Sequence, residues 1–186
     1  MGAVAERRLF TRQEYHAMAR AGILTEDDPV ELLDGEIIRK MPSGPAHAGL
    51  IKRLNRVLSA LVKETAIVSV QDPLALDEYS EPEPDVMLLR PRPDFYYESH
   101  PMSQDVWLVI EVADTSLTAD KEVNVPLYAS HEVPEVWLVD LEQRQVVAYS
   151  ALADGRYSRE RIYRSGEVIP LTALPGKQLH VAELGL

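Results

Sequence analysis

The sequence contains no cysteine, which excludes disulfide bonds, thiolate zinc sites and cysteine nucleophiles. Any bound metal must therefore be held by oxygen or imidazole ligands. The five histidines show neither the HExxH motif nor another paired spacing typical of zinc hydrolases. These absences favour a hard cation such as Mg²⁺, which binds carboxylate, carbonyl and water oxygens.

Long hydrophobic runs are also missing, since no apolar stretch reaches the roughly 18 residues that a membrane-spanning helix requires. Residues 1–8 lack the apolar stretch of a secretory signal, so we expect a cytoplasmic protein with no membrane partner. A glycine-rich phosphate loop, a Gly-x-Ser-x-Gly elbow and a dinucleotide-binding fingerprint are absent as well. The enzyme classes that depend on those motifs are therefore excluded.

Basic residues are in the minority, with 19 Lys and Arg against 30 Asp and Glu and a net charge of −11. This balance argues against the broad basic surface that usually accompanies nucleic-acid binding. It still permits a nuclease, because only the groove that faces phosphate must be positive, and a dimer can concentrate cations there. An acidic interaction domain unrelated to nucleic acid therefore stays open as an alternative.

The length of 186 residues and the hydrophobic content of 46% suffice for one core, so we expect a single domain over residues 1–186. Apolar spacing predicts helices over residues 11–22 and 45–63, and Asp34-Gly35 predicts a hairpin over residues 30–38. Short apolar, β-branched runs predict strands over residues 67–70, 74–76, 86–89, 106–112, 136–139, 145–149 and 155–163. This order of elements indicates an α/β fold.

Two features refine this prediction. Residues 106–110 are apolar on both faces, as in a central strand covered by helices on either side. A helical segment that ends near His131 contains Pro126, which must kink the helix or fall in its first turn, because proline has no amide hydrogen.

The predicted helix over residues 45–63 carries Lys52 and Arg56 on its polar face. Charged helix faces usually point to solvent. The same spacing also suits a nucleic-acid-binding stripe that contacts phosphates, and the sequence leaves both interpretations open.

Two acidic residues stand beside predicted central strands. Asp85 follows Pro84 at the start of one strand, and Glu111 lies at the end of the most apolar strand. A carboxylate in a dry environment loses several kcal/mol of solvation unless a cation or strong hydrogen bonds compensate it. A divalent metal shared by both carboxylates would do so, whereas a turn residue and a surface ion pair are the structural alternative.

Further motifs follow one another along most of the chain. They are ELLDGE at residues 31–36, EPEPDV at residues 81–86, VIEVADTS at residues 109–116, LYA at residues 127–129 and VPEVWLVD at residues 133–140. In type and order they resemble the Uma-type restriction endonuclease family of the PD-(D/E)XK nuclease superfamily. The resemblance implies an α/β fold with a restriction-endonuclease-like mixed β-sheet flanked by helices.

The resemblance also implies a catalytic site that hydrolyses DNA with Mg²⁺ or Mn²⁺. Asp85 and Glu111 would hold the metal, and the backbone carbonyl of Val112 could add a third oxygen. Such a cation lowers the pKa of bound water and offsets charge on the phosphate. A homodimer would allow two sites to address the two strands of DNA.

The sequence departs from this pattern at the lysine. The superfamily motif expects lysine two residues after the second acid, where this chain has Ala113, and the related family carries it on the next helix, at the position of Asn124. An amide cannot supply the positive charge of lysine. Lys121, about one helical turn earlier, could reach the same pocket. Otherwise the chain is a catalytically impaired nuclease fold that serves as a binding or assembly module.

Two residues are candidates for accessory roles. Glu31 matches a family acid near the pocket, although a cross-strand surface pair would explain it equally well. His47 occupies a position in the long helix where the family tends to have histidine, and packing or capping is the alternative.

Overall fold

The computed structural model describes residues 7–25, 27–40, 44–114 and 116–186. Its main sheet has six strands in the order β3-β4-β5-β6-β7-β8. Their bounds are β3 (Ile67–Val70), β4 (Val86–Leu89), β5 (Val106–Ala113), β6 (Val136–Asp140), β7 (Gln145–Ala153) and β8 (Arg156–Arg164). Strands β5 and β6 are parallel and the other neighbours are antiparallel. The predicted α/β fold with a mixed sheet is confirmed.

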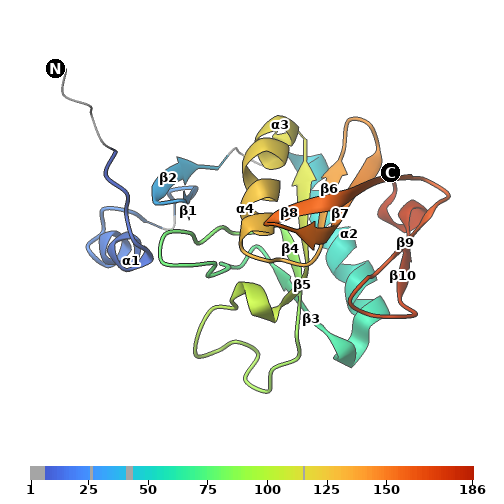
Figure 1. Cartoon of the computed structure of the whole chain (residues 1–186), viewed down its shortest axis with the longest axis horizontal. Helices are drawn as coiled ribbons and strands as arrows, with labels where there is room; N and C mark the ends of the chain where they lie inside the picture. The colour runs from blue at the N-terminus through green and yellow to red at the C-terminus, as the bar shows by residue number, and fades with distance from the viewer. Residues whose placement is uncertain (1–6, 26, 41–43, 115) are drawn as a thin grey trace.

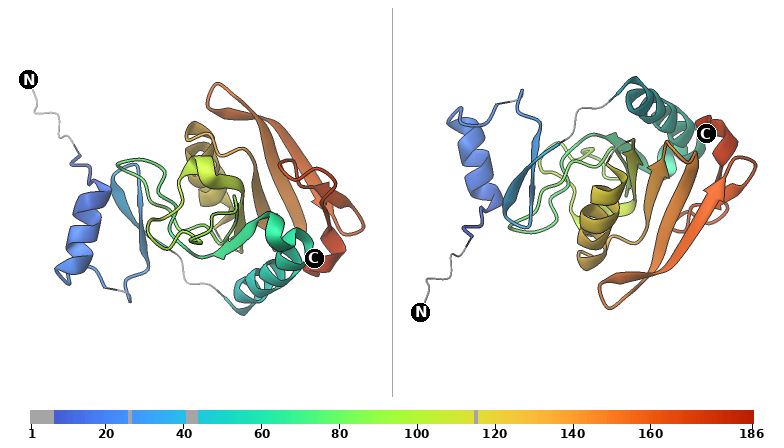
Figure 2. Two further views of the ribbon diagram at one scale, coloured as in Figure 1. Left: turned by 90° about the horizontal axis from the view of Figure 1, so that it is seen from below. Right: turned by 90° about the horizontal axis from the view of Figure 1, so that it is seen from above.

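Helices cover both faces of this sheet (Figure 2). Helix α2 (Pro45–Val62) lies on one face, and α3 (Leu117–Ala119), the π-helix η3 (Asp120–Asn124) and α4 (Val125–Ser130) lie on the other. Short 3-10 turns, η1 (Lys63–Thr65) and η2 (Ser103–Asp105), follow α2 and precede β5. The predicted break near Pro126 is confirmed, since this residue falls in the first turn of α4.

Side chains along β5 alternate between the sheet face covered by α2 and the face covered by α4. Leu108, Ile110 and Val112 pack in the cluster that contains α2, whereas Val109 and Ala113 pack in the cluster that contains α4. Successive side chains of a strand point to opposite faces. Glu111, between Ile110 and Val112, therefore lies on the α4 side of the sheet.

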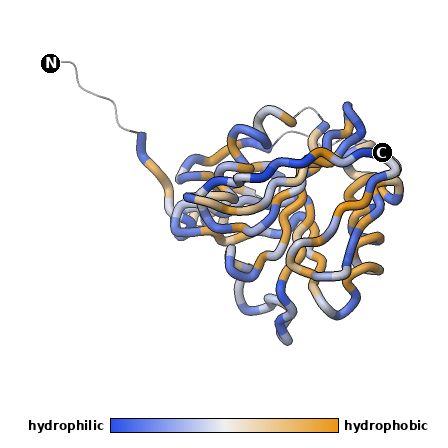
Figure 3. Tube along the Cα trace, turned by 45° about the vertical axis from the view of Figure 1, so that its right-hand side comes forward, coloured by the Kyte–Doolittle hydropathy of each residue, from blue (hydrophilic) through white to orange (hydrophobic). Residues whose placement is uncertain are grey.

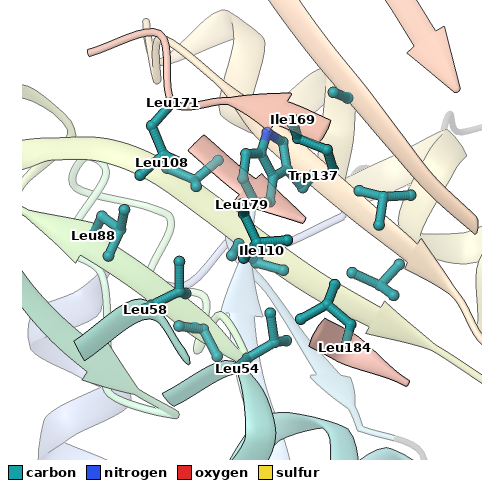
Figure 4. Packing of buried hydrophobic residues seen from close by; sticks show 14 of the residues in the cluster. Leu54, Leu58, Leu88, Leu108, Ile110, Trp137, Ile169, Leu171, Leu179 and Leu184 are labelled. Atoms are coloured by element: carbon teal, nitrogen blue, oxygen red, sulfur yellow. The ribbon is translucent and has the colours of Figure 1, made fainter. Parts of the chain in front are cut away.

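The C-terminal segment completes the core on the α2 side, which the sequence did not predict. A hairpin of β9 (Val168–Pro170) and β10 (Gln178–His180) precedes the 3-10 helix η4 (Val181–Leu184). Figure 4 shows Ile169 and Leu179 beside Trp137, and Leu184 nearer to Leu54 of α2. Leu171 belongs to the same buried cluster. These short runs become structured because they bury apolar side chains against the α2 side of the sheet.

The N-terminal elements lie at the opposite side of the molecule from β9 and β10 (Figure 1). Helix α1 (Arg12–Arg20) begins at Thr11, whose hydroxyl accepts a hydrogen bond from the Glu14 amide in a capping box. Strands β1 (Val30–Leu33) and β2 (Glu36–Arg39) form the predicted hairpin. An isolated bridge between Leu32 and Glu81 connects this hairpin to the segment before β4.

Gly35 in the turn of that hairpin supports a stability prediction. Its φ is +78°, and a Cβ there would lie 2.6 Å from the Cβ of Leu9. Gly22 is a matched control, because its φ is +70° but nothing lies within 4 Å of an added Cβ. The left-handed backbone costs about 1–2 kcal/mol in either alanine variant, and overpacking adds about 1 kcal/mol or more to Gly35→Ala. Urea unfolding measures the stability of both alanine variants. An equal loss of unfolding free energy in Gly35→Ala and Gly22→Ala would contradict the contact with Leu9.

The strand predicted over residues 74–76 is wrong. Leu74 and Leu76 are buried, but their amides donate to the carbonyls of Pro82 and Ser80, within the loop that returns toward β4. Only Ala75 forms an isolated bridge, to Met102. The loop satisfies these backbone groups locally, so no ladder forms.

Hydrophobic stretches of the chain gather in the interior of the molecule, and hydrophilic stretches lie at many of the outer turns (Figure 3). Among the described residues, no helix combines the length and the apolarity needed to cross a membrane. Residues 1–6, which contribute to the prediction about a secretory signal, lie outside the described residues.

Candidate metal and active site

A pocket of about 190 Å³ lies where the β1–β2 hairpin, the start of α2, the start of β4, the end of β5 and the α3–η3 segment meet. We call it the Asp85–Glu111 pocket. The residues predicted from the sequence that line it are Glu31, His47, Asp85, Glu111, Val112 and Asn124. Five segments that are distant in sequence thus converge at one end of the central strands.

Asp85 directly precedes β4, at the point where the pairing between β4 and β5 stops. The pairing of these strands ends at Val86 and Ile110. Beyond it, the Val112 amide donates to Oδ2 of Asp85 at 2.9 Å. In an antiparallel pair of strands, the amide and the carbonyl of one residue point toward the same neighbouring strand. Because the Val112 amide points to Asp85, the Val112 carbonyl also faces the side of β5 on which Asp85 lies.

His47 fixes the same carboxylate from α2. Its Nε2 lies 3.1 Å from Oδ2 of Asp85, and this hydrogen bond raises the pKa of His47. The bond places His47 against the metal candidate Asp85. Its Nδ1 is buried and has no hydrogen-bond partner among the described residues.

Glu111 is the most deeply buried acid of the pocket, with 7% of the residue exposed. Its Oε1 accepts a hydrogen bond from the Tyr128 hydroxyl at 2.6 Å, and its Oε2 accepts one from the Asp85 amide at 3.2 Å. Burial and then the negative charge of Asp85 raise the pKa of Glu111 well above its usual range. A cation between the two carboxylates would remove that repulsion.

These donors suit a hard divalent cation. Oδ1 of Asp85 accepts no hydrogen bond from the described residues, and the second lone pairs of Glu111 are available. No three His, Asp or Glu side chains converge as a ready-made metal site in the part of the chain that the structure describes. Mg²⁺ fits such a pocket, because it commonly takes one or two carboxylates and keeps several waters.

Asn124 faces the pocket but is held by a neighbouring acid. Its Nδ2 donates to Oδ1 of Asp120 at 3.0 Å, and the Ser116 hydroxyl donates to Oδ2 at 2.6 Å. Burial raises the pKa of Asp120, although the Ser116 hydrogen bond opposes it. Sequence reasoning missed Asp120, for which the four-residue spacing to both partners was the available signal.

The chain is similar in sequence to one protein family and in fold to a solved structure. The Uma2 family model, described as "Putative restriction endonuclease", matches residues 12–182. The chain belongs to this family. A crystal structure from Anabaena variabilis, titled a "putative nuclease belonging to DUF820", has a TM-score of 0.65 and 18% identity, over 88% of this chain and 94% of that one. That similarity concerns the fold, and no curated protein matches the chain.

In this Uma2 chain, the structure places Lys121 outside the pocket. Its side chain is 54% exposed, and its Nζ lies 3.5 Å from Oε1 of Glu160 on β8. Lys52 and Arg56 are exposed on α2 and do not line the pocket either. Their positions match the interpretation of a solvated helix face.

Glu31 of the Uma2 chain reaches into the pocket. Its cross-strand partner is Ile38, so the alternative of a charged cross-strand pair does not apply. Oε2 of Glu31 accepts a hydrogen bond from the Glu83 amide at 3.2 Å. Burial raises the pKa of Glu31, and the positive charge of Lys40 opposes that shift.

Lys40 is a residue that sequence reasoning missed. Its Nζ donates to Oε2 and to the backbone carbonyl of Glu83, at 3.1 and 3.2 Å. Both residues line the Asp85–Glu111 pocket. No local pattern indicated this role, because the hairpin is distant in sequence from β4 and β5.

A larger cavity of about 670 Å³ lies elsewhere in the Uma2 chain, between the end of α2, β3 and the segment 91–95. It is mainly apolar, and Glu64 is the one acid among its lining residues. It offers no pair of carboxylates for a metal. The smaller Asp85–Glu111 pocket is the one that brings two carboxylates of the candidate site together.

Proposed function

We propose that this chain is a single-domain, Mg²⁺-dependent endonuclease that hydrolyses phosphodiester bonds of DNA at the Asp85–Glu111 pocket. The observation that carries the proposal is a pair of neighbouring acids, Asp85 just before β4 and Glu111 in β5, in a chain of the Uma2 family. The Asp85 amide donates a hydrogen bond to Oε2 of Glu111 at 3.2 Å. A buried carboxylate such as Glu111 beside the partly buried Asp85 is unfavourable unless a cation or strong hydrogen bonds compensate the charges.

The residues of the pocket have separate roles in this proposal. Asp85, Glu111 and the Val112 carbonyl would hold Mg²⁺ or Mn²⁺. When bound, such a cation lowers the pKa of water and offsets the charge of the phosphate. Tyr128 orients Glu111, and His47 and the Val112 amide orient Asp85 through the hydrogen bonds described above. These bonds keep the carboxylates in place before a cation arrives.

The direct test is cleavage of supercoiled and linear DNA by purified protein with Mg²⁺, Mn²⁺ or EDTA. We expect cleavage with either cation, none in EDTA, and none in the Asp85→Ala variant. Cleavage in EDTA, or an Asp85→Ala variant as active as wild type, would overturn the metal mechanism. Sedimentation with and without duplex DNA tests the further proposal that two copies act together on two strands.

A catalytically impaired binding or assembly module is the second candidate function. It is favoured by Asn124, whose amide is engaged by Asp120, and by Lys121, which pairs with Glu160. In that case Asn124→Lys should create Mg²⁺-dependent cleavage that wild type lacks. An inert but folded Asn124→Lys variant would contradict a simple loss of the lysine. Failure of wild type to retain DNA even at low salt would instead favour a partner other than nucleic acid.

A further inference from the structure

The Asp85–Glu111 pocket is strongly acidic for a site that is proposed to receive a phosphodiester. Five carboxylates line it: Glu31, Glu83, Asp85, Glu111 and Asp120. A divalent cation neutralises at most two of these charges, and the phosphate brings another negative charge. The pocket therefore needs a positive side chain that faces the substrate.

Lys40 meets this need from the end of the β1–β2 hairpin. Its side chain is 28% exposed, so it is neither sealed in the core nor free in solvent. Its ammonium has three donors, and the carboxylate and carbonyl of Glu83 engage two of them. One donor is left for a ligand in the pocket.

The surroundings of Lys40 keep it positively charged. Burial favours the neutral amine, but the negative charges of Glu31 and then Glu83 outweigh that effect and raise the pKa of Lys40 above its usual value. Lys40 therefore acts as a fixed positive charge and not as a base near neutral pH.

The other candidate cations are less suited. Lys121 and the α2 residues Lys52 and Arg56 do not line the pocket, and Lys121 is turned toward Glu160. Arg39 lines the pocket beside Lys40, but it is exposed and forms no hydrogen bond or ion pair with the described residues. Lys40 is the one held in place by pocket residues.

We propose that Lys40 contacts the phosphate of the substrate and supplies the positive charge that Asn124 cannot. This inference rests on the proposed function and deepens it, since it assigns the phosphate-binding cation of the same site. The Glu83 hydrogen bonds anchor the ammonium at the wall of the pocket, so little side-chain freedom is lost when a phosphate binds.

The test compares wild type with Lys40→Met, Lys40→Arg and Lys121→Met in two assays. In Mg²⁺, Lys40→Met should cleave DNA about 100-fold more slowly than wild type, the scale of losing one positioned donor to a developing charge. Lys40→Arg should retain part of the activity, and Lys121→Met should stay near wild type. Urea unfolding of each variant ensures that only folded proteins are compared.

The second assay needs neither cleavage nor metal. Retention of a short DNA duplex is measured in EDTA over a series of salt concentrations. Loss of one phosphate contact should lower the slope of log affinity against log salt by about 0.9 in Lys40→Met and leave it unchanged in Lys40→Arg. A purely structural role of Lys40 would not change this slope.

The outcomes separate the two proposals. If wild type cleaves and Lys40→Met matches it in rate and slope, only the assignment of Lys40 is wrong. The same holds if Lys121→Met shows the losses instead. If wild type binds DNA without cleaving it, the slope alone decides the role of Lys40 and the proposed endonuclease fails. If wild type neither cleaves nor retains DNA, both proposals fall together.

Discussion

Replacing Glu111 by glutamine should slow Mg²⁺-dependent DNA cleavage by at least about 1000-fold, equivalent to about 4 kcal/mol of activation barrier. Glutamine keeps the volume of Glu111 and can still accept the hydrogen bond from Tyr128. It lacks the negative charge that a cation beside Asp85 requires. Cleavage rates with saturating Mg²⁺ measure the loss.

Thermal unfolding gives an independent readout of the same variant. A ligand that binds only the folded state stabilises it by an amount that grows with its concentration. Mg²⁺ should therefore raise the unfolding temperature of wild type and not that of Glu111→Gln. A variant that keeps this Mg²⁺ effect would show that Glu111 is not a metal ligand.

Glu135 offers a matched control for this experiment. It is another buried glutamate, and it accepts hydrogen bonds from Nε1 of Trp137 and the amide of Thr172, away from the pocket. Glu135→Gln should change stability while retaining cleavage and the Mg²⁺ effect on unfolding. Equal losses of cleavage in both variants would indicate a general sensitivity of buried acids instead of a metal site.

Replacing Trp137 by alanine should destabilise the fold by about 3–5 kcal/mol. Trp137 is fully buried in β6, between α2 and the C-terminal hairpin (Figure 4). The substitution leaves a large cavity and removes the donor at 2.7 Å from Oε1 of Glu135. Since domains typically have only about 5–15 kcal/mol of stability, the variant should unfold at much lower urea concentration.

Trp107 is the control for this prediction, because the chain has only two tryptophans. It is partly buried in β5 and lies beside the guanidinium of Arg90, 5.5 Å from the ring centroid. Trp107→Ala should cost clearly less than Trp137→Ala in the same urea titration. Equal costs would contradict the central position of Trp137 in the core.

Local sequence patterns predicted the elements whose geometry depends on near neighbours. Helix α2 follows from apolar residues at three- and four-residue spacing, and the β1–β2 turn follows from Asp34-Gly35. The continuous apolar run of β5 predicted a central strand covered on both faces. Each of these features is encoded within a few residues of the chain.

Elements that depend on distant partners could not be predicted in this way. Residues 168–170 and 178–180 become strands because they pair with each other and pack against α2. Residues 74–76 have the composition of a strand, but the amides of Leu74 and Leu76 donate within their own loop and only Ala75 pairs outside it. Apolar composition predicts burial in both cases, while the hydrogen-bond partner decides the secondary structure.

The sequence by itself determined the kinds of ligand available: oxygen and imidazole without cysteine, with Asp85 and Glu111 beside apolar strands. Only the tertiary structure decided that these two acids meet, that Lys121 turns toward Glu160, and that Lys40 enters the pocket. The physical reason is that residue spacing sets the face of a strand or helix on which a side chain lies. It does not set which elements become neighbours, because that depends on how the whole core packs.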